Sequence, residues 1–255
     1  MSTGTRAYRG FMAAAAAAML FPAAAKADIA GFGNFANWTV NINDTGAAPT
    51  VAPGLIHLIN NTSGEARSVI YDTPQSITGF TASFTYQNTG ASDAYGATFI
   101  LENATTGANA VGFNSTRFGY GFTGRSVAIT LEMTNPSLSG FYVNGNIGGG
   151  SSSTSPVDLH SGDPINITLS YDGAFLNETL VDVNTSATYH ASFLENLPSI
   201  LGANSAYVGV TASSNSADGT QTFSNFSFGA PEPASVAIMG VAGALLLARR
   251  RRRAY

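Results

Sequence analysis

Residues 165–183 read INITLSYDGAFLNETLVDV. Apolar and polar side chains alternate along Ile165–Tyr171, and a second such run covers residues 179–183. Asp172-Gly173 lies between the two runs, and this dipeptide favours the tight turn of an antiparallel hairpin. A period of two residues places one set of side chains on a buried face and the other on an exposed face. The segment therefore predicts a β-hairpin that packs one face on a core.

The same period recurs on both sides of this hairpin. Residues 77–86, ITGFTASFTY, place Phe80, Ala82, Phe84 and Tyr86 on one face, and residues 207–211 form another run. No stretch between the two ends of the chain has a strong helical period. Regularly spaced strands with Gly and Asn turns are typical of a β-sandwich or jelly roll. Three other segments are predicted to be a turn at Asn144-Gly145, a flexible surface loop at residues 148–155 and one helical turn at residues 198–202.

The composition excludes several classes of partner. Between residues 28 and 229 the only basic residues other than histidine are Arg67, Arg117 and Arg125, while most of the carboxylates of the chain lie there. An acidic domain is not expected to bind nucleic acid or an anionic membrane. The chain has no cysteine, so packing and sheet hydrogen bonds must supply its stability.

The first 27 residues have the pattern of a signal peptide. Arg6 and Arg9 precede an apolar, alanine-rich run over residues 11–25, and Ala25-Lys26-Ala27 matches a small-x-small cleavage site. The run is shorter than the ~20 residues that a membrane span needs. We expect residues 1–27 to be removed, export of the rest, and a domain at residues 28–229.

The last 26 residues, 230–255, carry a second signal. A Pro-Glu-Pro motif is followed by the small and apolar run 234–248 and then by five arginines. Under the positive-inside rule the arginines stay cytoplasmic, which predicts a short transmembrane helix. This order resembles the PEP-CTERM sorting signal of Gram-negative bacteria, which exosortase-type membrane enzymes recognise and cleave. The signal residues are Pro231, Glu232, Pro233, Arg249, Arg250, Arg251, Arg252 and Arg253.

The strands between the two ends resemble a known family in order. They are similar to the L-type (legume-type) lectin domain, the concanavalin A-like jelly roll, in its bacterial form. The resemblance implies an all-β, concanavalin A-like jelly-roll β-sandwich between the signal peptide and the short transmembrane helix. The segments that carry it are residues 35–41 (FANWTVN), 65–71 (EARSVIY), 80–86 (FTASFTY), 95–101 (YGATFIL), 126–132 (SVAITLE), 207–212 (YVGVTA) and 221–228 (QTFSNFSF).

The resemblance also implies where a sugar would bind. The family uses an Asp before a Gly, a Gly-rich loop and an Asn, all from loops at one end of the sandwich. Here Tyr95 stands before the Gly, Asp93 lies two residues earlier, and residues 112–118 replace the Gly-rich loop. Phe118 and Tyr120 either form an aromatic platform or pack these loops on the core. The loop 213–218 is either a specificity loop or a plain polar hairpin. The sugar-binding candidates are Asp93, Tyr95, Gly96, Asn114, Arg117 and Asn215.

The metal site of the family is poorly matched. It needs a Glu and an Asp two residues apart on a strand, and those positions are Thr130 and Glu132 here. Leu138 stands near the place of the metal-binding His, and Asn135 is the only nearby amide. Calcium takes six to eight oxygen ligands. We therefore predict that the family's calcium and manganese site is lost, with a calcium site shifted to other loops as the alternative.

Nothing in the sequence predicts catalysis. Retaining glycosidases need two carboxylates on one face, about 5–5.5 Å apart, and no such pair flanks Glu132. Asp158 and Asp163 have the positions of solvated loop acids, and the three histidines have no metal-like spacing. The predicted function is non-catalytic carbohydrate binding at the cell surface or in exopolysaccharide. The alternative is a structural surface or biofilm matrix protein that has lost sugar and metal binding.

Overall fold

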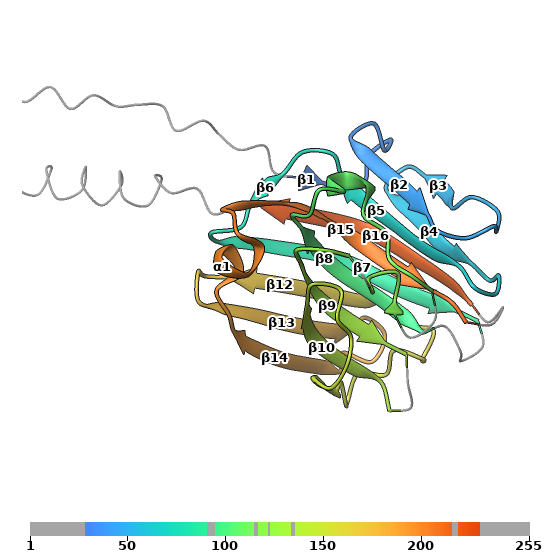
Figure 1. The fold of residues 1–255 in the computed structure, drawn as a ribbon. Coiled ribbons are helices and arrows are strands. Elements are labelled where there is room, and N and C mark those ends of the chain that lie inside the picture. Colours follow the sequence, from blue (N-terminus) through green and yellow to red (C-terminus); the bar gives the residue numbers. More distant parts are fainter. Residues whose placement is uncertain are drawn as a thin grey trace, which may run out of the picture. The chain divides into compact units, whose positions relative to one another are not determined.

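The computed structural model describes residues 29–90, 95–114, 117–121, 123–133, 136–215 and 219–229. These residues form a sandwich of two antiparallel sheets, each with eight strands in the described ranges (Figure 1). The predicted signal peptide and the predicted sorting tail lie outside the described residues. Within those residues, no helix has the length and apolar character that a bilayer span requires.

The first sheet, called the β7 sheet, contains the hairpin predicted at residues 165–183. In spatial order its strands are β14 (Thr188–Leu194), β13 (Phe175–Asp182), β12 (Ile165–Tyr171), β7 (Phe80–Thr89), β16 (Thr220–Gly229), β4 (Leu55–Asn60) and β3 (Thr50–Ala52), with β1 (Ile29–Ala30) paired to β16. The predicted hairpin is confirmed, because β12 pairs with β13 from Ile165 opposite Asp182 to Tyr171 opposite Leu176. The Asp172 side chain closes the turn by accepting hydrogen bonds from the backbone N–H groups of Ala174 and Phe175.

The second sheet, called the β8 sheet, carries the segments on which the family resemblance depends most. In spatial order its strands are β11 (Ser151–Ser153), β10 (Leu138–Val143), β9 (Ser126–Glu132), β8 (Gly96–Glu102), β15 (Ser205–Ser213), β5 (Ala66–Tyr71) and β2 (Trp38–Ile42), with β6 (Gln75–Ser76) paired to β15. One short 3₁₀ helix (Gly107–Asn109) and α1 (Leu197–Leu201) lie outside the sheets.

The core lies between the two sheets and follows the period of two. In β7 the side chains of Phe80, Ala82, Phe84 and Tyr86 are buried, while Thr81 is exposed. The predicted faces are confirmed, although the strand runs from Phe80 to Thr89 rather than over residues 77–86. Burying one large apolar side chain stabilises the fold by about 1.5–3 kcal/mol, so the aromatic side chains of this core contribute strongly.

The outer face of the β8 sheet is also covered. Every residue of β8 and β9 is buried, including the outward-facing ones. Part of the chain between these two strands lies on that face, where Ser68 donates a hydrogen bond to the Ala110 carbonyl and Thr211 to the Phe118 carbonyl. The middle of this segment includes residues 112–118, one of the loops that were predicted to bind sugar.

Three local predictions have different outcomes. Asn144 and Gly145 both have positive φ, 55° and 68°, as a tight turn requires, and α1 forms at the predicted helical turn with its end at Gly202. The predicted flexible loop at residues 148–155 is wrong in part, because Ser151–Ser153 forms β11 and pairs with β10. Without β11, the outer edge of β10 would have unpaired N–H and C=O groups. A polar segment without a strong conformational preference can pair with such groups.

Candidate functional site

The predicted loops adjoin the strand ends at one end of the β8 sheet. β8 begins there at Gly96, which stands opposite Glu132 at the end of β9 and opposite Ser213 at the end of β15. Ser213 in turn stands opposite Ala66 at the start of β5. The loops that continue from these ends are therefore neighbours. Asp93 lies outside the described residues, and the other five candidates lie inside them.

Gly96 is required by the backbone at this end. Its φ is +132°, and a Cβ atom placed on it would lie 2.0 Å from the Leu131 carbonyl oxygen. L residues with a side chain rarely adopt this φ, and the contact with β9 leaves no room for a larger residue. The structural role of Gly96 is therefore to let β8 approach β9.

Tyr95 and Arg117 are both partly buried, and backbone hydrogen bonds hold each of them in place. The carbonyl oxygen of Tyr95 accepts a hydrogen bond from Met133 N–H at 3.0 Å. The carbonyl oxygen of Arg117 accepts from Tyr120 and Gly121, and its aliphatic side chain lies close against Gly121. These contacts fix the loops and leave each side chain only partly open to solvent.

Asn114 and Asn215 are the two exposed candidates, and one turn joins them. Asn114 Nδ2 donates a hydrogen bond to the Gly64 carbonyl at 3.0 Å. Ser63 Oγ donates to the Asn215 carbonyl at 2.6 Å. The turn between β4 and β5 thus holds two loops that are about a hundred residues apart in sequence. Among the described residues, no hydrogen bond uses the side-chain oxygen of Asn114 or the side-chain amide of Asn215, so these groups can serve other partners.

Of the two alternatives for Phe118 and Tyr120, packing on the core is the correct one. The two side chains are 4% and 0% exposed, so they pack the covering segment on the sheet instead of forming an aromatic platform. The exposed ring in this loop is Phe113, at 52%. A large exposed apolar ring beside Asn114 was a usable signal in the sequence, but the sequence does not show which of three nearby aromatics faces outward.

A buried ionic cluster around Arg67 lies beside the turn that joins these loops. Arg67 is fully buried; its Nε donates to Asp44 Oδ2 at 3.0 Å, and its Nη2 lies 2.5 Å from Glu65 Oε1. The contact between Arg67 and Glu65 is an ion pair without a well-aligned hydrogen bond, because Glu65 Oε1 accepts no hydrogen bond from a described residue. Arg67 also donates to the carbonyls of Leu58 and Ala47. The cluster thereby joins β5, β4 and the chain after β2.

The two carboxylates of this cluster differ in their protonation equilibria. Burial tends to raise the pKa of Asp44, but hydrogen bonds from Arg67 and from the N–H groups of Ala66 and Gly46 outweigh it and hold that pKa below its usual value. Burial raises the pKa of Glu65, and the Asn60 N–H group and the Arg67 charge offset only part of the effect. Of the two carboxyl groups, Asp44 therefore has the stronger tendency to stay ionised beside Arg67.

The residues at the family's metal position do not fit a metal pair. Glu132 is 7% exposed and its Oε1 accepts hydrogen bonds from Thr130 at 3.0 Å and Tyr142 at 3.1 Å. Leu138 stands opposite it, and Asn135 lies outside the described residues. One carboxylate held by two neutral hydroxyls is far from six to eight oxygen ligands. Across the described ranges, no three His, Cys, Asp or Glu residues form a group able to hold a metal.

Comparison with known proteins identifies the fold. The lectin I-B4 of Griffonia simplicifolia, in a metal-free form, superposes with a TM-score of 0.66 at 19% identity, over 81% of this chain and 100% of that chain. The chain has the fold of the legume lectins. A lectin of Bauhinia forficata in complex with GalNAc matches at 0.64 and 16%, over 79% and 96% of the two chains. Winged bean acidic lectin complexed with methyl-α-D-galactose matches at 0.61 and 16%, over 79% and 97%.

These likenesses concern the sandwich alone. No protein-family model matches the sequence, and a search of the curated proteins finds no match. The predicted all-β sandwich with a legume-lectin-like, concanavalin A-like arrangement is confirmed. Loops generally vary more than strands among proteins of one fold, so at identities below 20% any ligand must be argued from the loops of this chain.

Proposed function

We propose that this chain is an exported protein of the bacterial cell surface or extracellular matrix, and that its sandwich binds carbohydrate without catalysis. The observation that carries the carbohydrate proposal is the legume-lectin fold, since two of the matching structures are lectins with a bound sugar. The proposed ligand is a glycan of the cell's own exopolysaccharide.

The loops at the end of the β8 sheet support this proposal. Sugar sites combine an aromatic face with a few polar groups of fixed orientation. Phe113 offers an exposed ring, Asn114 an adjacent amide, and Asn215 a second amide on the neighbouring loop. The hydrogen bonds to the turn 61–64 and the buried Arg67 cluster hold these loops in place, which lowers the entropy that binding must overcome.

One set of observations favours a second function, that of a structural matrix protein. The metal residues of the family are replaced around Glu132, and both rings considered for an aromatic platform, Phe118 and Tyr120, are buried. A sandwich of this kind can keep its fold and serve as a spacer in the matrix, because fold does not determine function.

A glycan array decides between these functions. The full-length chain is applied in calcium and again in chelator, next to the variants Asn114→Ala and Asn166→Ala. We expect retention of one glycan class in both buffers, because the residues around Glu132 do not fit a metal site. Asn114→Ala should weaken retention, whereas Asn166→Ala, the same change at an exposed position of the β7 sheet, should not. If no glycan is retained above background in either buffer, the structural role is favoured instead.

The export and sorting proposal rests on the two ends of the sequence. The chain would cross the inner membrane, be anchored by residues 234–248, be cleaved near Pro231 by an exosortase-type enzyme, and then reach the surface or matrix. Deleting residues 231–255 should change both the processing and the location of the protein in cell fractions. Unchanged processing and location in that deletion would reject this part of the proposal.

A further inference from the structure

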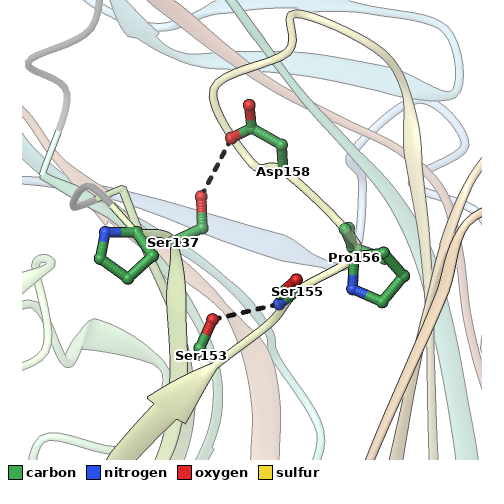
Figure 2. Close-up of a pocket in the computed structure, with 7 residues that line it drawn as sticks. Ser137, Ser153, Ser155, Pro156 and Asp158 are labelled. Carbon is green, nitrogen blue, oxygen red and sulfur yellow. Dashed lines mark hydrogen bonds between the residues drawn. The ribbon is translucent and has the colours of Figure 1, made fainter.

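A small pocket lies at the edge of the β8 sheet where β10 begins and β11 ends (Figure 2). Its volume is about 200 Å³. Pockets for drug-sized ligands measure roughly 300–1,000 Å³, so this one suits a single small residue. Its lining combines three hydroxyls, two proline rings and one carboxylate, from Ser137, Ser153, Ser155, Pro136, Pro156 and Asp158.

The walls of the pocket are held rigidly by the fold. Thr154 is fully buried; its N–H donates to the Ser137 carbonyl at 2.9 Å and its hydroxyl to the Val157 carbonyl at 2.8 Å. Val157 and Leu159, each 2% exposed, belong to the core between the sheets. A wall that is fixed before binding loses little conformational entropy when a ligand enters.

Asp158 is oriented on one side and open on the other. Its Oδ1 accepts hydrogen bonds from the Ser137 hydroxyl at 3.2 Å and from His160 N–H at 2.9 Å. Its Oδ2 accepts none from any described residue, and the side chain is 65% exposed. Figure 2 shows Ser137 bonded to one oxygen of this carboxylate. An oriented carboxylate with an open oxygen can accept hydrogen bonds from a ligand.

The cluster of Ser137, His160 and Asp158 is not arranged for hydrolysis. The same ring nitrogen of His160, Nδ1, lies 3.2 Å from Ser137 Oγ and 3.4 Å from Asp158 Oδ1. A catalytic histidine holds the carboxylate with one ring nitrogen and takes the serine proton with the other. Ser137 Oγ also accepts a hydrogen bond from Leu159 N–H, so the serine serves to fix the loop.

The chemistry of the lining selects a class of ligand. Hydroxyls and a carboxylate suit a molecule with several neighbouring hydroxyl groups, while the proline rings suit its C–H surface. Asp158 would repel an anionic sugar such as a uronate, and the chain as a whole has a net charge of −4. A neutral sugar residue has this combination of size and polarity.

The pocket is separate from the loops that carry Asn114 and Asn215. Ser153 belongs to β11 and Ser213 to β15, four strands apart in the order of the β8 sheet. At about 4.8 Å per strand the two positions are about 20 Å apart. We propose that this pocket is a second saccharide subsite, which takes one neutral sugar residue on Asp158 and the surrounding serines. This inference rests on the proposed carbohydrate binding and assigns part of it to residues outside the predicted loops.

The test is a titration of the ¹⁵N-labelled, full-length chain, monitored by NMR through the chemical shifts of its backbone amides. The probes are methyl α-D-galactoside, methyl α-D-glucoside and galacturonate. We expect a neutral glycoside to shift the amides of Ser137, Ser155 and Asp158, and galacturonate to leave them unchanged. Asp158→Asn keeps the shape and the acceptor for Ser137, yet it should bind at least about tenfold more weakly because a charge-assisted hydrogen bond becomes neutral. Asp163→Asn is the matched control and should bind as the wild type does, because Asp163 lies in the same connection between β11 and β12 but outside the pocket.

The outcomes separate this inference from the proposed function. A glycan retained on the array, with shifts only around Asn114 and Asn215 and equal binding by Asp158→Asn, overturns the second subsite and keeps carbohydrate binding. An array without any retained glycan, together with no shift for any probe, overturns both. Pocket shifts that disappear in Asp158→Asn and persist in Asp163→Asn support the second subsite.

Discussion

Glu65 and Glu178 are both buried carboxylates, 0% and 1% exposed, but their charges are balanced in different ways. Glu65 lies against the Arg67 guanidinium, which also holds Asp44. Glu178 projects from β13 into the space between the sheets, where both of its oxygens accept from one hydroxyl, that of Ser139 on β10, at 2.8 and 2.7 Å. The first site is an ion cluster below the candidate loops, and the second is a carboxyl group held by a neutral donor.

The difference shows how one sandwich tolerates two kinds of buried acid. The Arg67 guanidinium helps to hold the pKa of Asp44 below its usual value and offsets part of the rise that burial causes at Glu65, whereas a hydroxyl offsets little of the cost of burying a charge. Burial raises the pKa of Glu178 to about 7, and the hydrogen bond from Ser139 lowers it only in part. Tyr189 on β14 is close enough for the Glu178 charge to raise its pKa, in addition to the larger effect of burial. The stability of the edge near β13 should therefore decline as pH rises towards neutral.

Replacing Arg67 should have the largest effect on stability. Arg67→Met keeps much of the side-chain volume and leaves Asp44 and Glu65 without their cation. Removing one partner of a buried ion cluster costs about 3–5 kcal/mol, because the remaining charges stay buried. We expect this loss in the free energy of unfolding measured by urea denaturation. Arg125→Met changes an exposed arginine and should cost less than about 0.5 kcal/mol. Equal losses in the two variants would show that the cluster is not an important source of stability.

Glu178→Gln should remove a pH dependence of stability. The folded-state pKa is about 7 and the ordinary value is 4.5, so the folded protein binds a proton that the unfolded chain has released in this interval. The contribution is fully present below pH 4.5, declines as pH rises to about 7, and is lost above it. The difference of 2.5 units corresponds to about 3 kcal/mol as an upper bound. Urea denaturation at several pH values should show this decline in the wild type and a smaller one in Glu178→Gln.

Two comparisons sharpen this second prediction. Burial also raises the pKa of Glu102 to about 7, so part of the decline should persist in Glu178→Gln and become smaller again in the double variant with Glu102→Gln, with Glu65 contributing a remainder. Ser139→Ala removes the hydroxyl and keeps the acid, so its stability should still fall with pH. A Glu178→Gln variant with the full wild-type slope would assign the effect to other groups.

Much of the sandwich could be predicted from sequence because the strands have a strict period of two. The burial of Arg67 and Glu178 follows from the same rule. Arg67 shares a buried face with Val69, and Glu178 shares one with Leu176 and Leu180. Their partners do not follow from it. Glu178 meets Ser139 across the two sheets and Arg67 meets Asp44 on another segment, and these contacts depend on how the sheets and loops are arranged.

The candidate site shows the same limit. The sequence placed Asn114 and Asn215 on loops at one end, but it did not indicate that the turn 61–64 joins them. It also placed β8 correctly while leaving open which of Phe113, Phe118 and Tyr120 is exposed, because a loop has no period that defines a face. The pocket at Asp158 was missed because residues 148–155 have the composition of a free loop, whereas pairing with β10 fixes their position.

Asn114→Ala should have the smallest measurable effect on stability. It tests whether the hydrogen bond of the Asn114 side chain or the buried Arg67 cluster holds the loops in place. The change removes the hydrogen bond to the Gly64 carbonyl, which costs about 0.5–1 kcal/mol at an exposed site. Asn215→Ala is the matched control, because Ser63 bonds to the backbone carbonyl of Asn215 and that bond survives the substitution. We expect urea denaturation to show a small loss for Asn114→Ala and almost none for Asn215→Ala. If neither variant loses stability, the Arg67 cluster below the turn suffices to hold these loops, and their exposed amides are then free to serve a ligand.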